Sequence, residues 1–419
     1  MQVNTLADKI SKSKKNTILS SFFKNAVIKK FKYLKYGYIK IEDQSKIYKF
    51  GDPRSESKVN VQIYSSEFYV FLGSGGVTGV AESYMLGHWS ADNLVLLLQL
   101  VLKNKNILLS LDSGFAKLLS PINKIVHWSK QNTIKGSKQN ILAHYDLSNE
   151  FYKLWLDPSM TYSCGYFTNS SVSLEDASKE KIDRICRKLK LNKDDHVLEI
   201  GTGWGSFSVH AVKNYGCKIN TVTISDAQYE YASRLVKDNG LESQIQILNQ
   251  DYRKITGKYD KIVSIEMIEA VGHQFIPEYF SRISSLLKQD GLVAIQGITY
   301  NDQNFEKYKN SVDFIKKYIF PGSCLISIAQ ISDVVKNYTD LALVDMEDIT
   351  KHYAETLFRW KENFMSVIPQ VKEMGFSEAF IKMWEFYFVF CEAGFRERNI
   401  GDVQLIFSKS GARNIDIRY

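Results

Sequence analysis

Two carboxylates stand at the end of a segment that is typical of a buried strand. The segment covers residues 260–267, and Glu266 and Glu269 lie at its carboxyl end or directly after it. In open α/β sheets, ligands bind outside the carboxyl ends of the strands, so carboxylates at this edge are candidates for acid–base chemistry. The structural alternative is that Glu266 or Glu269 pairs with a neighbouring basic side chain.

A glycine-rich turn is a second candidate for ligand binding. The expected strand 196–200 runs directly into Gly201, Gly203 and Gly205, and a helical pattern follows. At such a junction glycine lets the backbone approach a ligand, and the helix N-terminus presents free N–H groups. The spacing differs from the dinucleotide fingerprint because Ser206 stands where that fingerprint has its third glycine. A tight turn without a ligand is the structural alternative.

Polar residues also follow the next two expected strands. Thr223 ends one strand, and Ser225 with Gln228 forms a capping-box pattern that starts the next helix. Asp251 and Tyr252 end the other strand and offer an acid and an aromatic ring to an adenine group. Each residue alone has a structural explanation. At three successive strand ends, they together favour a cofactor that contains a nucleoside.

A regular alternation of strands and helices places these residues on one sheet. The expected strands are 196–200, 218–224, 244–250, 260–267 and 291–298, and the expected helices are 175–190, 204–214, 226–238 and 276–288. Connections of this length require crossover helices and a parallel sheet. Later strands at 342–348 and 403–409, with helices at 326–338, 354–373 and 377–395, give a seven-stranded α/β sheet. That sheet matches class I methyltransferases, which have a Rossmann-like fold, better than a dinucleotide domain.

The length of 419 residues allows two or three domains. We expect a smaller N-terminal α+β domain at 1–128, in which short alternating runs between 58 and 71 predict two strands, 73–76 a turn and 80–104 a helix. Residues 129–141 are polar and basic without an apolar period, and therefore predict a linker. Residues 142–419 would form the catalytic domain, with the irregular stretch 299–323 roofing an apolar channel.

Basic charge is concentrated at the N-terminus. Residues 1–60 contain 14 Lys and Arg against five Asp and Glu, whereas the rest of the chain is nearly neutral. Apolar residues recur at helical spacing among these lysines, at Ile18, Leu19, Phe22, Phe23, Val27 and Phe31. Such a helix suits an anionic membrane surface, and the alternative is an ordinary helix packed on its own domain. Nucleic acid is less favoured because no groove-binding module is present.

The cysteine pattern predicts neither disulfides nor a metal site. The five cysteines are widely separated, and no C-x-x-C pair occurs. The longest apolar run, 94–102, is too short to span a bilayer. We therefore expect a cytoplasmic protein that associates peripherally with the inner face of the membrane. The oligomeric state stays open, a homodimer included.

The motifs above resemble one enzyme family. Over roughly residues 58–409, the chain is similar to the cyclopropane-fatty-acyl-phospholipid synthases. Besides the glycine loop and Thr223–Ser225, the matching segments are Glu82–Trp89, His144–Asp146, Tyr162–Cys164, Gln250–Tyr252, Glu269–His273, Lys317–Gly322 and Phe395–Arg396. The resemblance implies a transferase that uses S-adenosylmethionine to add a methylene group across the double bond of an unsaturated phospholipid acyl chain. Methyl transfer would leave a carbocation, and a bound bicarbonate would take a proton so that the ring closes.

The resemblance also implies roles for individual residues. Cys164, Glu269, Tyr353 and the backbone of Ile298 would surround the bicarbonate. Gln296 stands where many bacterial members have histidine, and an amide can donate a hydrogen bond to an anion but cannot relay a proton. The residues expected to bind the cofactor are Tyr162, Ser163, Gly201, Gly203, Gly205, Thr223, Gln228, Asp251 and Tyr252.

Three alternatives accompany this interpretation. Cys164 could be a small buried hydrophobe and Tyr353 a packed ring. Because Gln296 replaces the histidine, the cation could instead give a methylene-branched chain, or the acceptor could be another lipid. A non-catalytic lipid-binding protein is the third, and the intact glycine loop and Glu269 argue against it.

Overall fold

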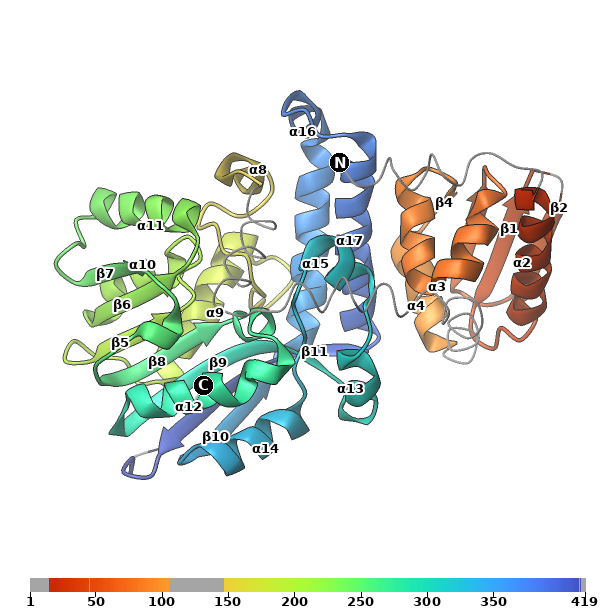
Figure 1. Cartoon of the computed structure of the whole chain (residues 1–419). Helices are drawn as coiled ribbons and strands as arrows, with labels where there is room; N and C mark the ends of the chain where they lie inside the picture. Colours follow the sequence, from red (N-terminus) through yellow and green to blue (C-terminus); the bar gives the residue numbers. More distant parts are fainter. Residues whose placement is uncertain (1–14, 45, 105–146, 414, 416–419) are drawn as a thin grey trace. The chain divides into compact units, whose positions relative to one another are not determined.

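The structure is a computed structural model that describes residues 15–44, 46–104, 147–413 and 415 (Figure 1). The chain divides into two compact units. The described part of the N-terminal unit comprises residues 15–104, without residue 45, together with 312–315 and 368–397. The α/β unit comprises 147–311, 316–367 and the described residues from 398 onwards.

The α/β unit is built on a seven-stranded sheet. Its strands are β5 (His196–Ile200), β6 (Lys218–Thr223), β7 (Ile245–Asn249), β8 (Tyr259–Ile265), β9 (Leu287–Tyr300), β10 (Leu341–Asp348) and β11 (Ile400–Lys409). The spatial order is β10-β11-β9-β8-β5-β6-β7. Neighbours from β9 to β7 are parallel, whereas β11 runs antiparallel to both β9 and β10. The predicted seven-stranded α/β fold is confirmed.

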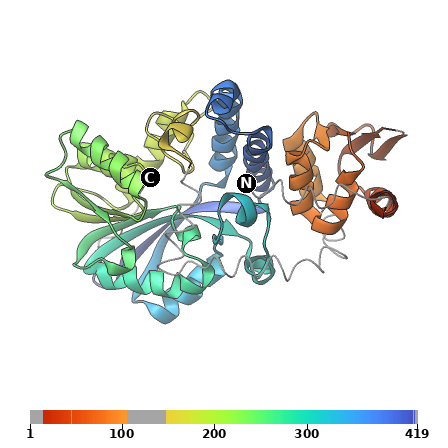
Figure 2. The same cartoon turned by 45° about the horizontal axis from the view of Figure 1, so that its top comes forward.

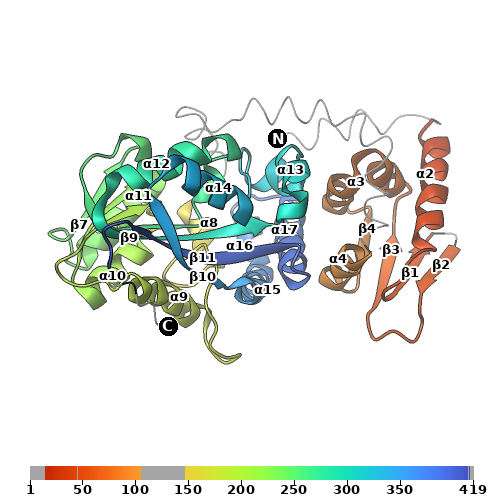
Figure 3. The same cartoon turned by 90° about the horizontal axis from the view of Figure 1, so that it is seen from below.

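Helices cover both faces of this sheet (Figure 3). The described α-helices of this unit are α8 (Asn149–Lys153), α9 (Leu174–Lys188), α10 (Ser206–Tyr215), α11 (Asp226–Asp238), α12 (Ile276–Leu286), α13 (Asp302–Lys309), α14 (Ile328–Tyr338) and α15 (Thr350–Ser366). Apolar residues of α9, α10 and α11 share one buried cluster with the sheet, and those of α12 and α14 share the other. Both faces are buried, which explains the nearly continuous apolar runs in the central strands.

Two expected helices end earlier than predicted. The pattern at 276–288 stops at Leu286 because β9 already begins at Leu287. The pattern at 354–373 is two helices, α15 and α16 (Ile368–Glu373), and Pro369 occupies the second position of α16. Proline has no backbone N–H and is tolerated only in the first turn, so the helix cannot run through it.

The N-terminal unit contains a four-stranded sheet and helices (Figure 2). Its elements are α2 (Lys15–Phe31), β1 (Tyr38–Asp43), β2 (Lys46–Gly51), β3 (Lys58–Ile63), α3 (Glu67–Met85), β4 (Trp89–Ala91), α4 (Leu94–Lys103), α16 and α17 (Glu378–Arg396). The strand order is β2-β1-β3-β4, and β1 pairs parallel to β3. Helix α17 packs against α3 and α4.

The expectations for this unit are partly wrong. Residues 68–70, expected as a strand, belong to α3, where Phe68 to Leu72 are all buried. A continuous apolar run does not distinguish a buried helix from a buried strand. The expected turn at 73–76 is only a kink at Gly76 within α3, and the expected helix 80–104 is interrupted by Gly87 and β4.

The basic helix packs on its own unit. Phe23, Val27 and Phe31 are buried, and the Phe31 ring lies 5.6 Å from that of Phe50. Helix α2 packs along α3, so the second half of the apolar stripe belongs to the core, whereas Leu19 is 42% exposed. Phe22 and Tyr33 are likewise 58% and 72% exposed.

The predicted domain boundaries fall outside the described residues. The end at 128 and the linker 129–141 lie between the described residues 104 and 147. Within the predicted catalytic range, Ile368–Glu397 groups with the N-terminal unit. Among the described residues, no helix is both long enough and apolar enough to cross a bilayer.

Helix α3 offers a matched test of packing in the N-terminal unit. A Cβ at Gly79 would lie 1.9 Å from the carbonyl oxygen of Phe71, whereas a Cβ at Gly75 would meet no atom within 4 Å. We expect Gly79→Ala to lower the free energy of unfolding by about 1–3 kcal/mol, and Gly75→Ala to leave it unchanged or raise it slightly. Urea denaturation followed by circular dichroism checks both. Equal effects of the two substitutions would contradict the packing of α3.

Candidate functional site

The glycine loop lies at the carboxyl end of β5 and leads into α10. Gly201, Gly203 and Gly205 have φ values of 100°, 53° and 94°, in the left-handed region that favours glycine. A Cβ at Gly203 would meet no atom within 4 Å, so this side of the loop is open to a ligand. At the end of the loop, the Trp204 indole N–H donates to Asn149 Oδ1 at 2.8 Å. The N–H groups of Gly201, Thr202 and Gly205 donate to backbone carbonyl oxygens, so it is the open side at Gly203 that suits the loop to a cofactor.

The predicted residues on the neighbouring strand ends lie at the same edge of the sheet. Thr223 ends β6, and its hydroxyl donates to Gln228 Oε1 at 2.9 Å. Ser225 Oγ accepts the N–H of Gln228, as half of the predicted capping box. The second hydrogen bond of the box, from the Ser225 N–H to the Gln228 side chain, is not formed, because this N–H donates to Thr223 Oγ1 instead. Gln228 therefore joins β6 to α11.

Beyond β7, Asp251 is held by Arg253. Both carboxylate oxygens of Asp251 accept from the guanidinium, at 2.8 and 2.6 Å. Burial raises the pKa of Asp251, but the hydrogen bonds from Arg253 outweigh it, and the pKa lies below its ordinary value. Asp251 is therefore an ionised acceptor in a fixed position. The neighbouring Tyr252 packs its ring edge-on against Tyr279.

Glu266, directly after β8, gathers three donors that come from different elements. Its Oε1 accepts the Cys164 N–H at 2.8 Å and the Gln296 amide at 2.8 Å. Its Oε2 accepts the Tyr353 hydroxyl of α15 at 2.5 Å. Cys164, Gln296 and Tyr353 are buried, whereas Glu266 is only partly buried. The structure thus brings three predicted site residues together around one carboxylate.

The backbone of Glu266 is strained. Its φ is 48°, in the left-handed region that residues with a Cβ rarely adopt. The Glu266 N–H donates to the carbonyl oxygen of Gln296 at 2.9 Å, which holds this conformation against β9. Strain of this kind costs on the order of 1–3 kcal/mol and is concentrated at functional sites.

Glu269 is the second carboxyl group of the site. Its Oε1 accepts the backbone N–H of Ile298, a group that the family resemblance assigns to bicarbonate. Its Oε2 is buried and has no hydrogen-bond partner among the described residues. Burial, and then the charge of Glu266, raise the pKa of Glu269 to about 8. Near neutral pH the carboxyl is therefore mostly protonated, with one oxygen left for a ligand.

A buried lysine and a third carboxyl group complete the charge arrangement. Lys181 of α9 is 1% exposed, and its Nζ donates to Ser163 Oγ at 2.7 Å. Asp402 of β11 is fully buried, and burial, followed by the nearby Glu266 and Glu269, raises its pKa well above the ordinary value. One ammonium group balances only one ionised carboxylate. Burial raises the pKa of Glu266 as well, but Lys181 and three hydrogen-bond donors oppose this, so Glu266 is the acid of the three that is best placed to carry the charge.

Gln296 connects these acids to a buried polar chain. Its amide nitrogen donates to Glu266 and, at 3.2 Å, to Asp402 Oδ2. Its amide oxygen accepts from Gln404 Nε2 at 3.1 Å, and Gln404 Oε1 accepts from Lys188 Nζ at 2.9 Å. Both ends of the Gln296 amide are engaged, so its orientation is fixed.

Aromatic rings line the neighbourhood of the acids. The Tyr162 ring lies 5.5 Å from those of Tyr152 and Trp155 and 5.2 Å from that of Trp360. The Tyr353 ring meets Trp360 edge-on at 6.1 Å. Such rings exclude water and offer electron-rich faces to a cation.

The expected bicarbonate does not fit these residues as they stand. The N–H of Cys164, the amide of Gln296 and the hydroxyl of Tyr353 all donate to Glu266, and the N–H of Ile298 donates to Glu269. The Cys164 thiol, whose pKa is raised by burial, donates to the Gly165 carbonyl oxygen. The donors expected to hold bicarbonate therefore already have acceptors within the chain.

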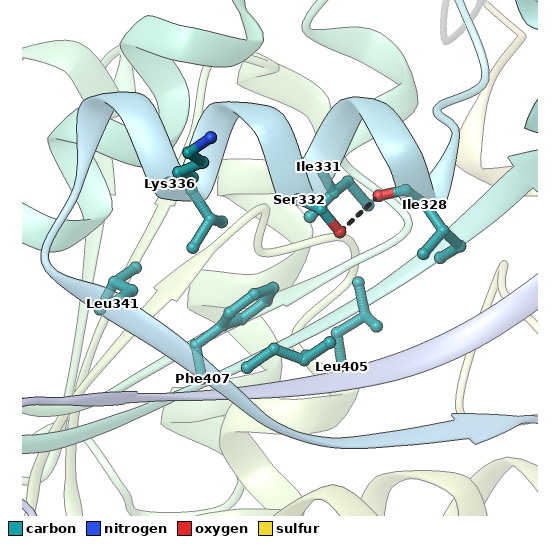
Figure 4. A pocket seen from close by; sticks show the side chains of 9 residues that line it. Ile328, Ile331, Ser332, Lys336, Leu341, Leu405 and Phe407 are labelled. Atoms are coloured by element: carbon teal, nitrogen blue, oxygen red, sulfur yellow. Dashed lines mark hydrogen bonds between the residues drawn. The ribbon is translucent and has the colours of Figure 1, made fainter.

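An apolar pocket of about 240 Å³ lies elsewhere, between α14 and strands β10 and β11 (Figure 4). Its lining includes Ile328, Ile331, Leu405 and Phe407, which are part of the core on that face of the sheet or packed against it. None of the predicted site residues lines it.

Sequence reasoning missed the two residues that set the charge of the site. Lys181 stands on the buried face of α9 with Ala177, Ile182 and Ile185, and a lysine at such an apolar position is a usable signal. Asp402 likewise interrupts the apolar run of β11. Both side chains become interpretable only when the fold places them beside Glu266.

Comparisons with known proteins identify the family of this chain. Residues 132–405 match the family described as mycolic acid cyclopropane synthetase. The tuberculostearic acid methyltransferase UfaA1 of Mycobacterium tuberculosis is 36% identical over 347 residues, 81% of each chain. The cyclopropane-fatty-acyl-phospholipid synthase of Escherichia coli K12 is 32% identical over 353 residues, 84% of this chain and 88% of the relative.

The fold comparison points the same way. The mycolic acid cyclopropane synthase CmaA1, solved in complex with SAH and CTAB, superposes with a TM-score of 0.61 at 29% identity, over 65% of this chain and 98% of that one. The cyclopropane synthase MmaA2 of Mycobacterium tuberculosis gives a TM-score of 0.61 at 27% identity, over the same shares. The chain therefore belongs to the mycolic acid cyclopropane synthetase family and is an S-adenosylmethionine-dependent methyltransferase.

Proposed function

We propose that this chain transfers a methylene group from S-adenosylmethionine to the double bond of an unsaturated phospholipid acyl chain, giving a cyclopropane ring. The observation that carries the proposal is the acid cluster of the partly buried Glu266 and the buried Glu269 and Asp402 beside an aromatic lining. An alkene has no proton to lose before it attacks, so the base is needed after transfer, next to a carbocation. The named activity of the Escherichia coli relative supports the same acceptor.

Different residues of the chain would bind the methyl donor, stabilise the cation and orient the reacting groups. The glycine loop and Asp251 would hold the nucleoside part of the methyl donor, and the donor supplies an electrophilic methyl group. Tyr162 and Trp360 belong to the aromatic lining, which would exclude water and stabilise the cation through ring faces. The protonated carboxyl of Glu269 would donate a hydrogen bond from its second oxygen and so orient the reacting groups.

A second product is favoured by a specific residue. Gln296, at the position where many bacterial cyclopropane synthases have histidine, cannot relay a proton, and the UfaA1 relative is named as a methyltransferase. The cation could therefore yield a methylene-branched chain. Ring and branched products have the same mass, so proton NMR of the extracted fatty acid methyl esters distinguishes them.

We propose that the substrate is reached at an anionic membrane surface. Helix α2 and the turn after it expose Phe22, Lys29, Lys32, Tyr33, Lys35 and Tyr36, which we call the basic aromatic face. Exposed aromatic rings suit the bilayer interface, and lysines suit anionic headgroups. This surface supports a cytoplasmic, peripheral location.

Replacing Glu269 by glutamine tests the chemistry. We expect Glu269→Gln to lower product formation by on the order of 10²-fold or more, because the site loses an acid that is placed at the reacting centre. The affinity for S-adenosylmethionine, measured calorimetrically, should change little. The exposed Glu242→Gln is the matched control and should keep full activity. A parallel loss of cofactor affinity in Glu269→Gln would assign this residue to binding instead.

Glu269→Gln should also change how the stability of the folded chain depends on pH. The pKa of Glu269 is raised from 4.5 to about 8 in the folded chain, so folding takes up a proton between these values. This group therefore makes the folded state less stable as pH rises through that window. We expect Glu269→Gln to gain stability over the wild type as pH rises from about 5 to about 8. A difference that stays constant with pH would show that the pKa is not raised.

Charge reversal tests the membrane surface. We expect Lys29→Glu, Lys32→Glu and Lys35→Glu together to weaken binding to anionic vesicles at low salt, since each lysine near such a surface contributes about 1 kcal/mol. The exposed Lys193, Lys218 and Lys237 of the α/β unit provide the matched triple control. Cosedimentation with vesicles measures both. Equal binding of the two triple variants would remove the basic aromatic face from the proposal.

A further inference from the structure

The proposed function does not identify the base that removes the proton. A carbocation formed beside the acids has to lose a proton to some base. The donors that the family resemblance assigns to bicarbonate already bond to a carboxylate of the chain, with contacts of 2.8, 2.8 and 2.5 Å from Cys164, Gln296 and Tyr353. An external anion would have to displace all three contacts.

We propose that Glu266 is itself the base of the reaction and that this chain works without bicarbonate. The inference rests on the proposed function and names the residue that completes its chemistry. Glu266 lies where the base is needed, because it accepts the hydrogen bonds of the donors that were expected to hold bicarbonate. Its side chain is partly accessible, whereas the donor residues are buried.

Burial raises the pKa of Glu266, whereas Lys181 and the hydrogen bonds from Tyr353, Cys164 and Gln296 act in the opposite direction and favour its ionised form. The groups that face it are Lys181, Cys164, Glu269, Tyr353 and Asp402. Lys181 is the only cation among these five, and it is buried. Asp402 and Glu269 accept fewer hydrogen bonds than Glu266 does and are held neutral by burial and by its charge. The single negative charge that Lys181 balances therefore resides on the carboxylate with three donors.

The backbone supports a functional role. The φ of 48° at Glu266 suits glycine, and glycine would be less strained there. A glutamate kept in this conformation and held by Gln296 on both its N–H and its carboxylate is positioned by the surrounding structure. A glutamate that only filled space would not require this arrangement.

The proposed reaction has two steps, methyl transfer and proton removal. The π electron pair of the double bond forms a bond to the methyl carbon, and the methyl–sulfur bond breaks with its pair on sulfur, leaving a neutral thioether and a carbocation. A Glu266 oxygen then takes a proton from the new methyl group. The C–H electron pair becomes the third bond of the ring or, after a hydride shift, the double bond of a methylene branch. Glu266, now a neutral acid, returns the proton to water.

The experiment compares the purified full-length wild type with Glu266→Gln and Glu266→Gly, on unsaturated phospholipid vesicles, in buffer stripped of carbon dioxide and with bicarbonate added back. We expect the wild type to be equally active in both buffers. Glu266→Gln should lose on the order of 10²–10⁴-fold in both, since the amide occupies the donors without being a base. Glu266→Gly, which frees the donors, should be inactive without bicarbonate and recover activity with it.

A second measurement does not depend on turnover. Carbon-13 NMR of labelled bicarbonate should show binding to Glu266→Gly and none to the wild type, with S-adenosylmethionine affinity retained in both as evidence of folding. Bicarbonate bound by the wild type, a wild-type rate that depends on bicarbonate, or an active Glu266→Gln would overturn the inference. If the wild type makes no product from any unsaturated lipid, the proposed function fails, and the binding measurement still decides whether Glu266 replaces the anion.

Discussion

The site depends on a shortage of buried positive charge. Three carboxyl groups, on Glu266, Glu269 and Asp402, share one buried ammonium, that of Lys181. Burying an ionised carboxylate without a partner is costly, so two of the three acids are kept protonated. The distribution of hydrogen-bond donors then decides which acid carries the charge. Other properties of the reacting centre, including the raised pKa of Glu269, follow from this balance.

Strand register creates that balance. Ile265 of β8 pairs with Gln296 of β9, which brings the Gln296 amide beside the first residue after β8. On the other side of β9, Asp402 pairs with Ile298, and Gln404 pairs with Gln296. A shift of one residue in either pair would turn these side chains to the opposite face of the sheet and separate the acids from the donors.

Much of the α/β unit could be predicted from the sequence because its signals are local. The buried strands that lead into Gly201 and Glu266 can be recognised by their apolar composition. The edge of the sheet at which their ends meet follows from the parallel topology. The secondary structure of the N-terminal unit was predicted less well, because the buried run from Phe68 to Leu72 has no period that separates helix from strand. Lys181 and Asp402 could not be assigned to the site, because their roles depend on which residues the fold places near them. A lysine on an apolar helix face and an acid in an apolar strand each look like an isolated exception until the fold brings them to one carboxylate.

The same geometry bears on how one fold gives different products. Ring closure and methylene branching diverge at a carbocation that either loses a proton at once or first undergoes a hydride shift. A base fixed by Cys164, Gln296 and Tyr353 has one position and little freedom to follow the charge along the chain. The product is then set by where the acyl chain lies relative to that base and for how long the aromatic lining keeps water away from the cation. Chain position and ring packing, more than the identity of the base, would therefore separate the two outcomes in enzymes that share this site.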